Sequence, residues 1–239
     1  MGLNHFAFIT KIEQDGKDYL QEALQAGLNS ESMKNIPSSG FTKEQIAAIG
    51  AIPTSYLEYY YFKDSKLEHL KHAEKSRGER CMEIEEELLA IYQNAELHVK
   101  PAQLSQRGGA RYSEVAINLV NSIWNDVGDI QVVNVLNKGA MDFLDDNDAV
   151  EVCARIGKDG ATPLKVTGVI NDHLKEYIRQ VKAYEKHAVE AALEGSKIEA
   201  MRALVMNPLC GDLKTASACF DELVEAHKEF LPQFVKEEN

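Results

Sequence analysis

An imidazole, a run of phenols and several guanidinium groups are the side chains of this 239-residue sequence that are best suited to chemistry. A neutral imidazole such as that of His5 suits Mn²⁺, Fe²⁺, Co²⁺ or Zn²⁺, although a histidine at the end of a strand can equally be a structural residue. Residues 55–62 carry four tyrosines. A phenol has an ordinary pKa of about 10, so it needs a nearby cation or metal to act as a base at neutral pH. The same tyrosines could instead pack with their hydroxyls at the rim of a core.

Two arginines and two asparagines are further candidates. Arg77 and Arg107 could each contact a phosphate, because a guanidinium fork matches phosphate oxygens. The competing interpretation of Arg77 is a helix-surface residue paired with a neighbouring glutamate. Gly108 and Gly109 follow Arg107 and would permit close backbone approach. Asn134 and Asn137 lie at the end of an apolar strand, where a pocket lining and a strand cap are equally good interpretations.

Composition excludes several classes of protein. The formal net charge of −12 argues against a binder of the nucleic-acid backbone, which needs clustered Lys and Arg. No stretch is apolar enough to cross a membrane, and no signal peptide opens the chain. The four cysteines have neither CxxC nor zinc-knuckle spacing, so we expect reduced packing residues. A cytoplasmic protein is therefore expected.

Local patterns predict the elements that must position these groups. Residues 3–10 read as one buried strand, and residues 18–28 as a helix. Thr42 and Gln45 form a capping pattern that opens a helix through Ile49. Residues 65–94 read as one long helix that Gly78 interrupts, which indicates a bend or a packing contact there.

The second half of the chain continues this mixture of helices and strands. Residues 113–126 form a strongly amphipathic helix, followed by strands at residues 130–136 and 149–156 and a short one at 164–166. Residues 172–209 and 213–230 read as helices. The predicted fold class is α+β, mainly helical with a small mixed or antiparallel sheet, and residues 1–239 form one domain.

Blocks of sequence along the whole chain resemble the family 4 glycoside hydrolases, in the order expected of that family. They are GLNHF at 2–6, AIPTSYLEYYY at 51–61, SRGERCMEIE at 76–85, RGGARYS at 107–113, GDIQVVNVLNKGA at 128–140 and AHKEFLPQF at 226–234. The resemblance implies the C-terminal catalytic domain of an NAD- and metal-dependent enzyme. The GLNHF and AIPTSYLEYYY forms look more like the 6-phospho-β-glucosidases than the α-type members, although the α or β choice stays open.

The resemblance also implies roles for individual residues. His5 would ligate a divalent metal, usually manganese, and Tyr56 would be the catalytic base. Arg77 would meet the substrate, and Arg107 could close the site or contact the phosphate. Asn4 could contact substrate hydroxyls or support the backbone turn, and Asn134 is kept as a candidate for substrate binding from its place on the strand. The roles of the other tyrosines of the block stay open.

The implied reaction is a redox-assisted elimination. NAD oxidises C3 of the sugar, Tyr56 removes the acidified proton on C2 while the metal acts as a Lewis acid, and the glycosidic oxygen leaves from C1. Water then adds and the hydride returns to C3.

Two features of the family are not found in this sequence: the Gly-rich loop of an N-terminal Rossmann domain, and the metal-binding cysteine that precedes the GLNHF block. We therefore expect the C-terminal half of the enzyme, inactive without a complementary N-terminal half that binds NAD. The alternative is an inactive remnant, or a module for sugar-phosphate binding or oligomerisation. The resemblance further implies a homo-oligomer that binds a phosphorylated sugar, with no nucleic-acid or membrane partner.

Overall fold

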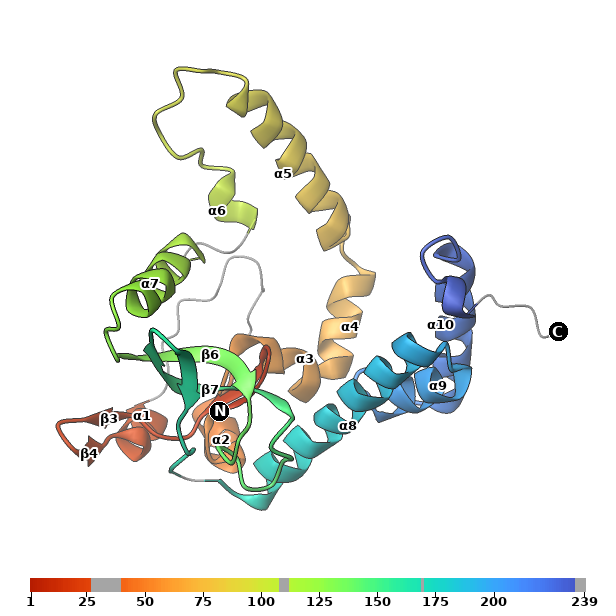
Figure 1. The fold of residues 1–239 in the computed structure, drawn as a ribbon. Helices are drawn as coiled ribbons and strands as arrows, with labels where there is room; N and C mark the ends of the chain where they lie inside the picture. Colours follow the sequence, from red (N-terminus) through yellow and green to blue (C-terminus); the bar gives the residue numbers. More distant parts are fainter. Residues whose placement is uncertain (27–39, 108–111, 169, 235–239) are drawn as a thin grey trace. The chain divides into compact units, whose positions relative to one another are not determined.

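The computed structural model describes residues 1–26, 40–107, 112–168 and 170–234, and these fall into two compact units. Unit 1 comprises Met1–Leu136 and Ala149–Val169, and unit 2 comprises Asn137–Asp148 and Ile170–Asn239. Each unit is described by itself. None of the described helices combines the length and apolar character that a bilayer span needs. The predicted fold class, mainly helical with a small antiparallel sheet, is confirmed (Figure 1).

The main sheet of unit 1 is antiparallel, with strand order β5-β2-β1-β7-β6, and β8 pairs with β7. Its strands are β1 (Gly2–Leu3), β2 (Phe6–Ile9), β5 (Ile52–Pro53), β6 (Ile130–Leu136), β7 (Ala149–Gly157) and β8 (Gly160–Pro163). A separate small hairpin joins β3 (Glu13–Gln14) to β4 (Lys17–Asp18). The strands predicted at 130–136 and 149–156 are confirmed, whereas the short third strand begins at Gly160 rather than near residue 164.

The prediction of a single strand over residues 3–10 is wrong, because the chain reverses at Asn4 and His5. Leu3 pairs with Phe6 and Gly2 with Ala7, so β1 and β2 form a tight hairpin. Gly2 is required there, since a Cβ atom at this position would lie 2.2 Å from the carbonyl oxygen of Phe6. The hairpin places Asn4 and His5 at an exposed tip.

The helices of unit 1 are α1 (Leu20–Ala26), α2 (Lys43–Ile49), α3 (Glu58–Tyr61), α4 (Lys63–Lys71), α5 (Arg77–Tyr92), α6 (Leu104–Arg107) and α7 (Tyr112–Trp124), with a 3₁₀ turn η1 (Ser55–Leu57). The capping box of Thr42 and Gln45 opens α2 as predicted. Apolar side chains of α1 and α2 pack with β5 in a small core that contains Leu20, Leu24, Ile46 and Ile52.

The single long helix predicted over residues 65–94 is wrong, because α4 ends at Lys71 and α5 begins after Ser76. Ser76 and Glu79 form a capping box that starts α5, so Gly78 lies inside the first helical turn and marks no bend. The apolar residues of the two helices also differ in burial. Leu67 and Leu70 of α4 are exposed, whereas Ile84 and Leu88 of α5 are buried.

Unit 2 is built from the helices α8 (Asp172–Glu194), α9 (Lys197–Met206) and α10 (Leu213–Ala226), followed by the 3₁₀ turn η2 (Pro232–Phe234). The continuous helix predicted over residues 172–209 is therefore interrupted. Gly195 ends α8 in the left-handed conformation with φ 68°, and Ser196 caps α9 through the backbone N–H of Glu199. A helical hairpin results, so side chains of α8 and α9 face each other.

Candidate functional site

The tip of the β1–β2 hairpin holds His5 in a strained conformation. Its φ of 64° lies in the left-handed region, which costs a residue other than glycine about 1 kcal/mol or more. Such strain persists where the surroundings fix the conformation, and it is concentrated at functional sites. The backbone of this turn is fixed by the pairing of Leu3 with Phe6, so the imidazole is held out at the surface.

Tyr56 lies against His5, although 50 residues of chain separate them. β5 pairs with β2 through Phe8 and Pro53, and the backbone N–H of Thr54 donates to the carbonyl oxygen of Ala7 at 3.0 Å. The chain then turns into η1, where the Tyr56 and His5 ring centroids are 4.4 Å apart at an interplanar angle of 64°. The Thr54 hydroxyl also donates to the His5 carbonyl oxygen at 3.3 Å. The sheet therefore brings together the predicted metal ligand and the predicted base.

Asn4 contacts the imidazole directly, because its Oδ1 atom accepts a hydrogen bond from Nδ1 of His5. A carboxamide oxygen can only accept, so Nδ1 carries the proton, and in the neutral imidazole Nε2 keeps its lone pair. Metal-binding histidines are oriented in this way, by a hydrogen bond from the nitrogen that does not ligate. His5 therefore fits a divalent metal as one ligand, and other groups must complete the coordination shell.

A buried carboxylate follows Tyr56 by two residues in the chain. Glu58 is only 1% exposed, forms a 2.7 Å ion pair with Lys66, and accepts the backbone N–H of Gly40 at 3.2 Å. Leu57, between Tyr56 and Glu58, is fully buried. The sequence analysis missed Glu58, although an acid within a run of aromatic residues is the signal that could have revealed it. Glu58 and Leu57 anchor the segment that presents Tyr56.

The remaining tyrosines of the block pack against neighbouring side chains. Tyr60 contacts Phe6 edge-to-face at 4.8 Å between ring centroids, and Tyr61 contacts Phe41 in the same way at 5.7 Å. The Tyr59 ring lies 5.8 Å from the ammonium nitrogen of Lys66. The role left open for these three residues thus includes packing within unit 1.

Arg77 lies at the start of α5 and joins that helix to α6. Its Nη2 atom donates to the carbonyl oxygen of Gln106 at 2.9 Å, and Nη2 of Arg80 donates to Oε1 of the same glutamine at 2.9 Å. Gln106 directly precedes Arg107, the other predicted arginine, at the end of α6. The contact therefore joins the two segments that carry the candidate arginines. The side chain of Arg107 and residues Gly108 and Gly109 lie outside the described part of the structure.

The two candidate asparagines have different environments. Asn137 is fully buried, and its side chain bonds backbone groups of Met141, Leu144 and Asp145 at 2.7–3.2 Å, so it holds a loop of unit 2 together. The structural interpretation of Asn137 is therefore the better one. Asn134 is exposed on β6, opposite Glu151, and β7 and β1 separate that strand from β2. A substrate contact by Asn134 stays a prediction.

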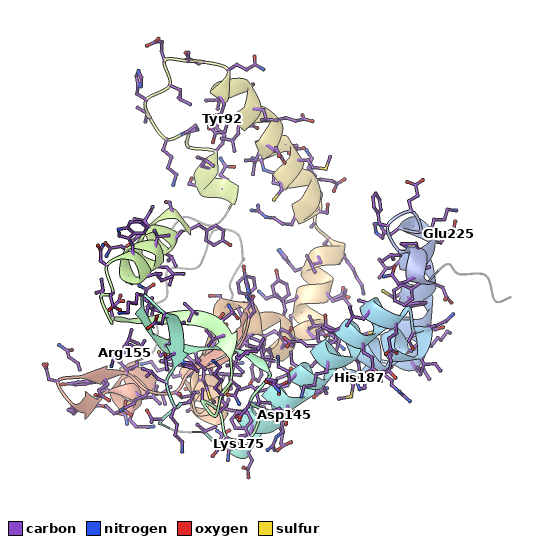
Figure 2. The ribbon with its side chains drawn as sticks, viewed as in Figure 1. Tyr92, Asp145, Arg155, Lys175, His187 and Glu225 are labelled. Atoms are coloured by element: carbon purple, nitrogen blue, oxygen red, sulfur yellow. The ribbon has the colours of Figure 1, made fainter. Side chains whose placement is uncertain are left out.

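A second histidine cluster, which the sequence analysis missed, lies between α8 and α9. Nδ1 of His187 is 2.7 Å from Oε2 of Glu199, and the other carboxylate oxygen contacts Arg202 (Figure 2 labels His187 on α8). Burial disfavours the charge of Glu199, but the hydrogen bonds and charges of His187 and Arg202 outweigh it and lower the pKa of the carboxyl. Glu190 completes a group whose ligand atoms lie within 4.8 Å of one another. Because both oxygens of Glu199 already have partners, the cluster serves as an ion-pair network.

The class of protein follows from comparison with known families. Residues 1–210 match the Family 4 glycosyl hydrolase C-terminal domain, so the chain belongs to this family, as the sequence resemblance implied. The chain is 38% identical over 239 residues to "Probable 6-phospho-beta-glucosidase" of Bacillus subtilis, covering 98% of this chain and 54% of that protein. It is 34% identical to "6-phospho-beta-glucosidase" of Escherichia coli, covering 98% of this chain and 53% of the relative.

A solved structure agrees with these sequence relatives. The 6-phospho-beta glucosidase of Thermotoga maritima, solved with manganese, NAD⁺ and glucose-6-phosphate, superimposes with a TM-score of 0.84 at 29% identity, covering 96% of this chain and 54% of that chain. The cofactors expected for the family, NAD and manganese, are thus both present in that enzyme. The chain spans about half the length of the relatives it matches.

Proposed function

We propose that this chain supplies the metal- and substrate-binding half of an NAD- and Mn-dependent 6-phospho-β-glucosidase, and that it is inactive until a nucleotide-binding half joins it. The observation that carries the proposal is the contact between His5 and Tyr56, two residues that only the sheet brings together. The more similar relatives support the β-linkage: three named 6-phospho-beta-glucosidases are 31–38% identical, whereas the relatives named for α-linked substrates are 29% identical or less.

In this proposal Tyr56 removes the proton from C2 of the sugar. The fixed geometry of η1 aims the phenol, and a divalent cation held by Nε2 of His5 would favour the phenolate and act as a Lewis acid toward the oxidised sugar. Asn4 keeps the imidazole in the tautomer that can ligate.

Arg77 and Arg107 are proposed to bind the sugar phosphate. Arg77 lies in the first turn of α5, where the helix dipole also favours an anion, and its link to Gln106 joins that turn to the helix ending at Arg107. We further propose substrate contacts for Asn4 and Asn134. Four free cysteines support a cytoplasmic location for the enzyme.

The second candidate function is a non-catalytic remnant, or a module for sugar-phosphate binding or oligomerisation. The observation that favours it is that residues 1–210 match the C-terminal domain of the family. The two candidates differ in one respect that can be measured: only the enzyme half gains a glucosidase activity when a nucleotide-binding half is added.

The test is hydrolysis of p-nitrophenyl-β-glucoside 6-phosphate in the presence of NAD and Mn²⁺. The chain is assayed alone and then mixed with the N-terminal half of the Bacillus subtilis relative. We expect activity only in the mixture, and Tyr56→Phe should lower it by about 100-fold or more because the base is removed. The matched control is Tyr60→Phe, which keeps its ring on Phe6 and should retain most of the activity.

Two results would contradict the proposal. If Tyr56→Phe and Tyr60→Phe lower activity equally, Tyr56 is not the base. If the mixture is inactive although the chain is folded and binds the added half, the remnant is the better interpretation.

A further inference from the structure

The turn between β1 and β2 is not one of the conformations that two-residue hairpins favour. Such hairpins are usually closed by turns with positive φ at both central residues or at the first one, because these turns match the twist of the strands. The β3–β4 hairpin follows this rule, since Asp15 and Gly16 have φ of 52° and 77°. Of the two central residues of the β1–β2 turn, Asn4 and His5, only the second has a positive φ. This turn therefore needs support from outside the hairpin.

Thr54 supplies a contact of this kind. It directly follows β5, which pairs with β2, and its backbone N–H donates to the carbonyl oxygen of Ala7 at 3.0 Å. Its hydroxyl donates to the carbonyl oxygen of His5 at 3.3 Å. The first bond continues the pairing of β5 with β2, whereas the second reaches past the end of β2 to the turn itself. A side chain from the segment that carries Tyr56 thus holds the residue whose backbone is strained.

The Thr54 hydroxyl is not used in the way that its place in the chain favours. Thr54 is the N-cap residue of η1, with the extended backbone that such residues have. An N-cap threonine normally accepts a backbone N–H of the turn that follows, as Thr42 does from Gln45 at the start of α2. The hydroxyl of Thr54 makes no cap bond of this kind to η1. It bonds His5 instead, a contact between two segments that are far apart in the chain.

This contact couples the position of the imidazole to that of the phenol. Thr54 precedes Tyr56 by two residues, and the fully buried side chain of Leu57 anchors the other end of η1. The Tyr56 ring is therefore fixed relative to Thr54, and the Thr54 hydroxyl in turn holds the backbone of His5. Displacing a group of an active site by about 1 Å can lower a rate by about 100-fold. A bond that aligns the two rings is thus suited to a role in the reaction.

We propose that Thr54 is a positioning residue of the candidate site, whose hydroxyl keeps the His5 turn in the strained conformation that places the imidazole against Tyr56. The inference rests on the proposed function, in which His5 ligates the metal and Tyr56 is the base. Without the hydroxyl the turn can relax, and the imidazole then moves away from the phenol. The fold itself remains, because β2 and β5 keep their backbone pairing.

The first test needs neither NAD nor metal. Nuclear Overhauser effects between the ring protons of His5 and Tyr56 are measured by NMR in the full chain, and wild type should show them because the rings are in contact. Thr54→Val replaces the hydroxyl by a methyl group and should remove most of their intensity, since the effect falls steeply with distance. Thr54→Ser keeps the hydroxyl and should restore them. Circular dichroism verifies that each variant is folded.

Thr42→Val provides the matched control. It removes the hydroxyl of an N-cap threonine that does cap its helix, so it should lower the melting temperature. It should nevertheless leave the contact between His5 and Tyr56 intact. If the Thr54 hydroxyl only stabilises the fold, the two valine variants should behave alike.

The second test uses the chain mixed with the nucleotide-binding half. Thr54→Val should raise the Mn²⁺ concentration that gives half-maximal activity by about tenfold, as the loss of a group that orients a metal ligand does. It should also lower kcat by about tenfold, because the base is no longer aligned. The KM for the sugar phosphate should change by less than about twofold, since the residues proposed to bind the phosphate are not altered.

The two tests fail in different ways. A contact between the rings that Thr54→Val leaves intact would overturn the inference, and so would a wild-type chain that lacks the contact. A loss that Thr54→Ser shares would mean that the hydroxyl is not the group that acts. An inactive mixture would contradict the proposed function instead, and the NMR comparison would still decide whether Thr54 positions His5.

Discussion

Two histidines of the described chain, His5 and His187, differ in almost every respect. His5 lies at an exposed hairpin tip with a left-handed backbone, contacts a phenol and an amide, and keeps a lone pair on Nε2. His187 lies on a regular helix and bonds to Glu199, whose other oxygen contacts Arg202. In the second cluster, both carboxylate oxygens of Glu199 have partners. In the first, the backbone of His5 is strained, and no contact of its Nε2 atom is found among the described residues.

This difference separates a candidate site from a structural network better than the residue types do. Both clusters contain a histidine and a polar partner, and the second even has the two carboxylates that a metal site favours. However, a group that already has its partners can bind a ligand only by losing them. A ligand could bind Nε2 of His5 without displacing a partner of that atom among the described residues. For this reason we assign function to the strained His5 turn. The following changes test the contrast.

The largest effect is expected from Glu58, on which the support of the site depends. Glu58→Ala removes a buried carboxylate that pairs with Lys66 and accepts from the backbone of Gly40, so the free energy of unfolding should fall by about 3–5 kcal/mol in urea titrations. The exposed pair of Lys11 and Glu13 provides the control, and Glu13→Ala should change stability by less than about 1 kcal/mol. Equal effects would mean that Tyr56 is not held by a buried charge pair.

The two asparagines give the next contrast. Asn137→Ala removes a buried side chain and leaves backbone groups of Met141 and Leu144 without a partner, so a loss of about 2–3 kcal/mol is expected. Asn134→Ala, on the exposed face of β6, should stay within about 0.5 kcal/mol. Thermal unfolding of both variants is the measurement, and a large loss for Asn134 would give that residue a structural role.

His5→Gly should have a smaller effect on stability, of the opposite sign. Glycine adopts a φ of 64° without strain, so the variant should gain up to about 1 kcal/mol of unfolding free energy while the mixed enzyme loses its response to Mn²⁺. His5→Ala, which keeps a Cβ atom, is the control for strain and should lose the metal response without gaining stability. A destabilised glycine variant would place His5 among the structural histidines.

The smallest effect concerns the pH dependence of the His187 cluster. The pKa of Glu199 is lowered in the folded chain, so its contribution to stability is present above the ordinary value of 4.5 and is lost as pH falls through the lowered folded value. Glu199→Gln should therefore lower the melting temperature at pH 7, and the difference from wild type should shrink in acid. A difference that does not vary with pH would show that the charge of Glu199 is unimportant.

Local signals in the sequence predicted the parts of the fold that depend on neighbouring residues. The capping box at Thr42 and the strands β6 and β7 were found, and the box of Ser76 and Glu79 was readable but was overlooked in favour of apolar periodicity. The reversal at Asn4 and His5 was missed because no glycine marks it. The pairs of His5 with Tyr56 and of His187 with Glu199 depend on sheet pairing and on a helical hairpin, which residue spacing does not reveal.

Gly2 contributes no functional group, yet it decides where the imidazole points. A Cβ atom at Gly2 would collide with the backbone of Phe6 and Ala7, so any other residue forces the hairpin to open or to shift its register. A shift of one residue turns every side chain of a strand to the opposite face of the sheet and would carry His5 away from Tyr56. The missing side chain is therefore part of the site: it is a steric constraint on alignment, and it would be invisible to any search for reactive groups.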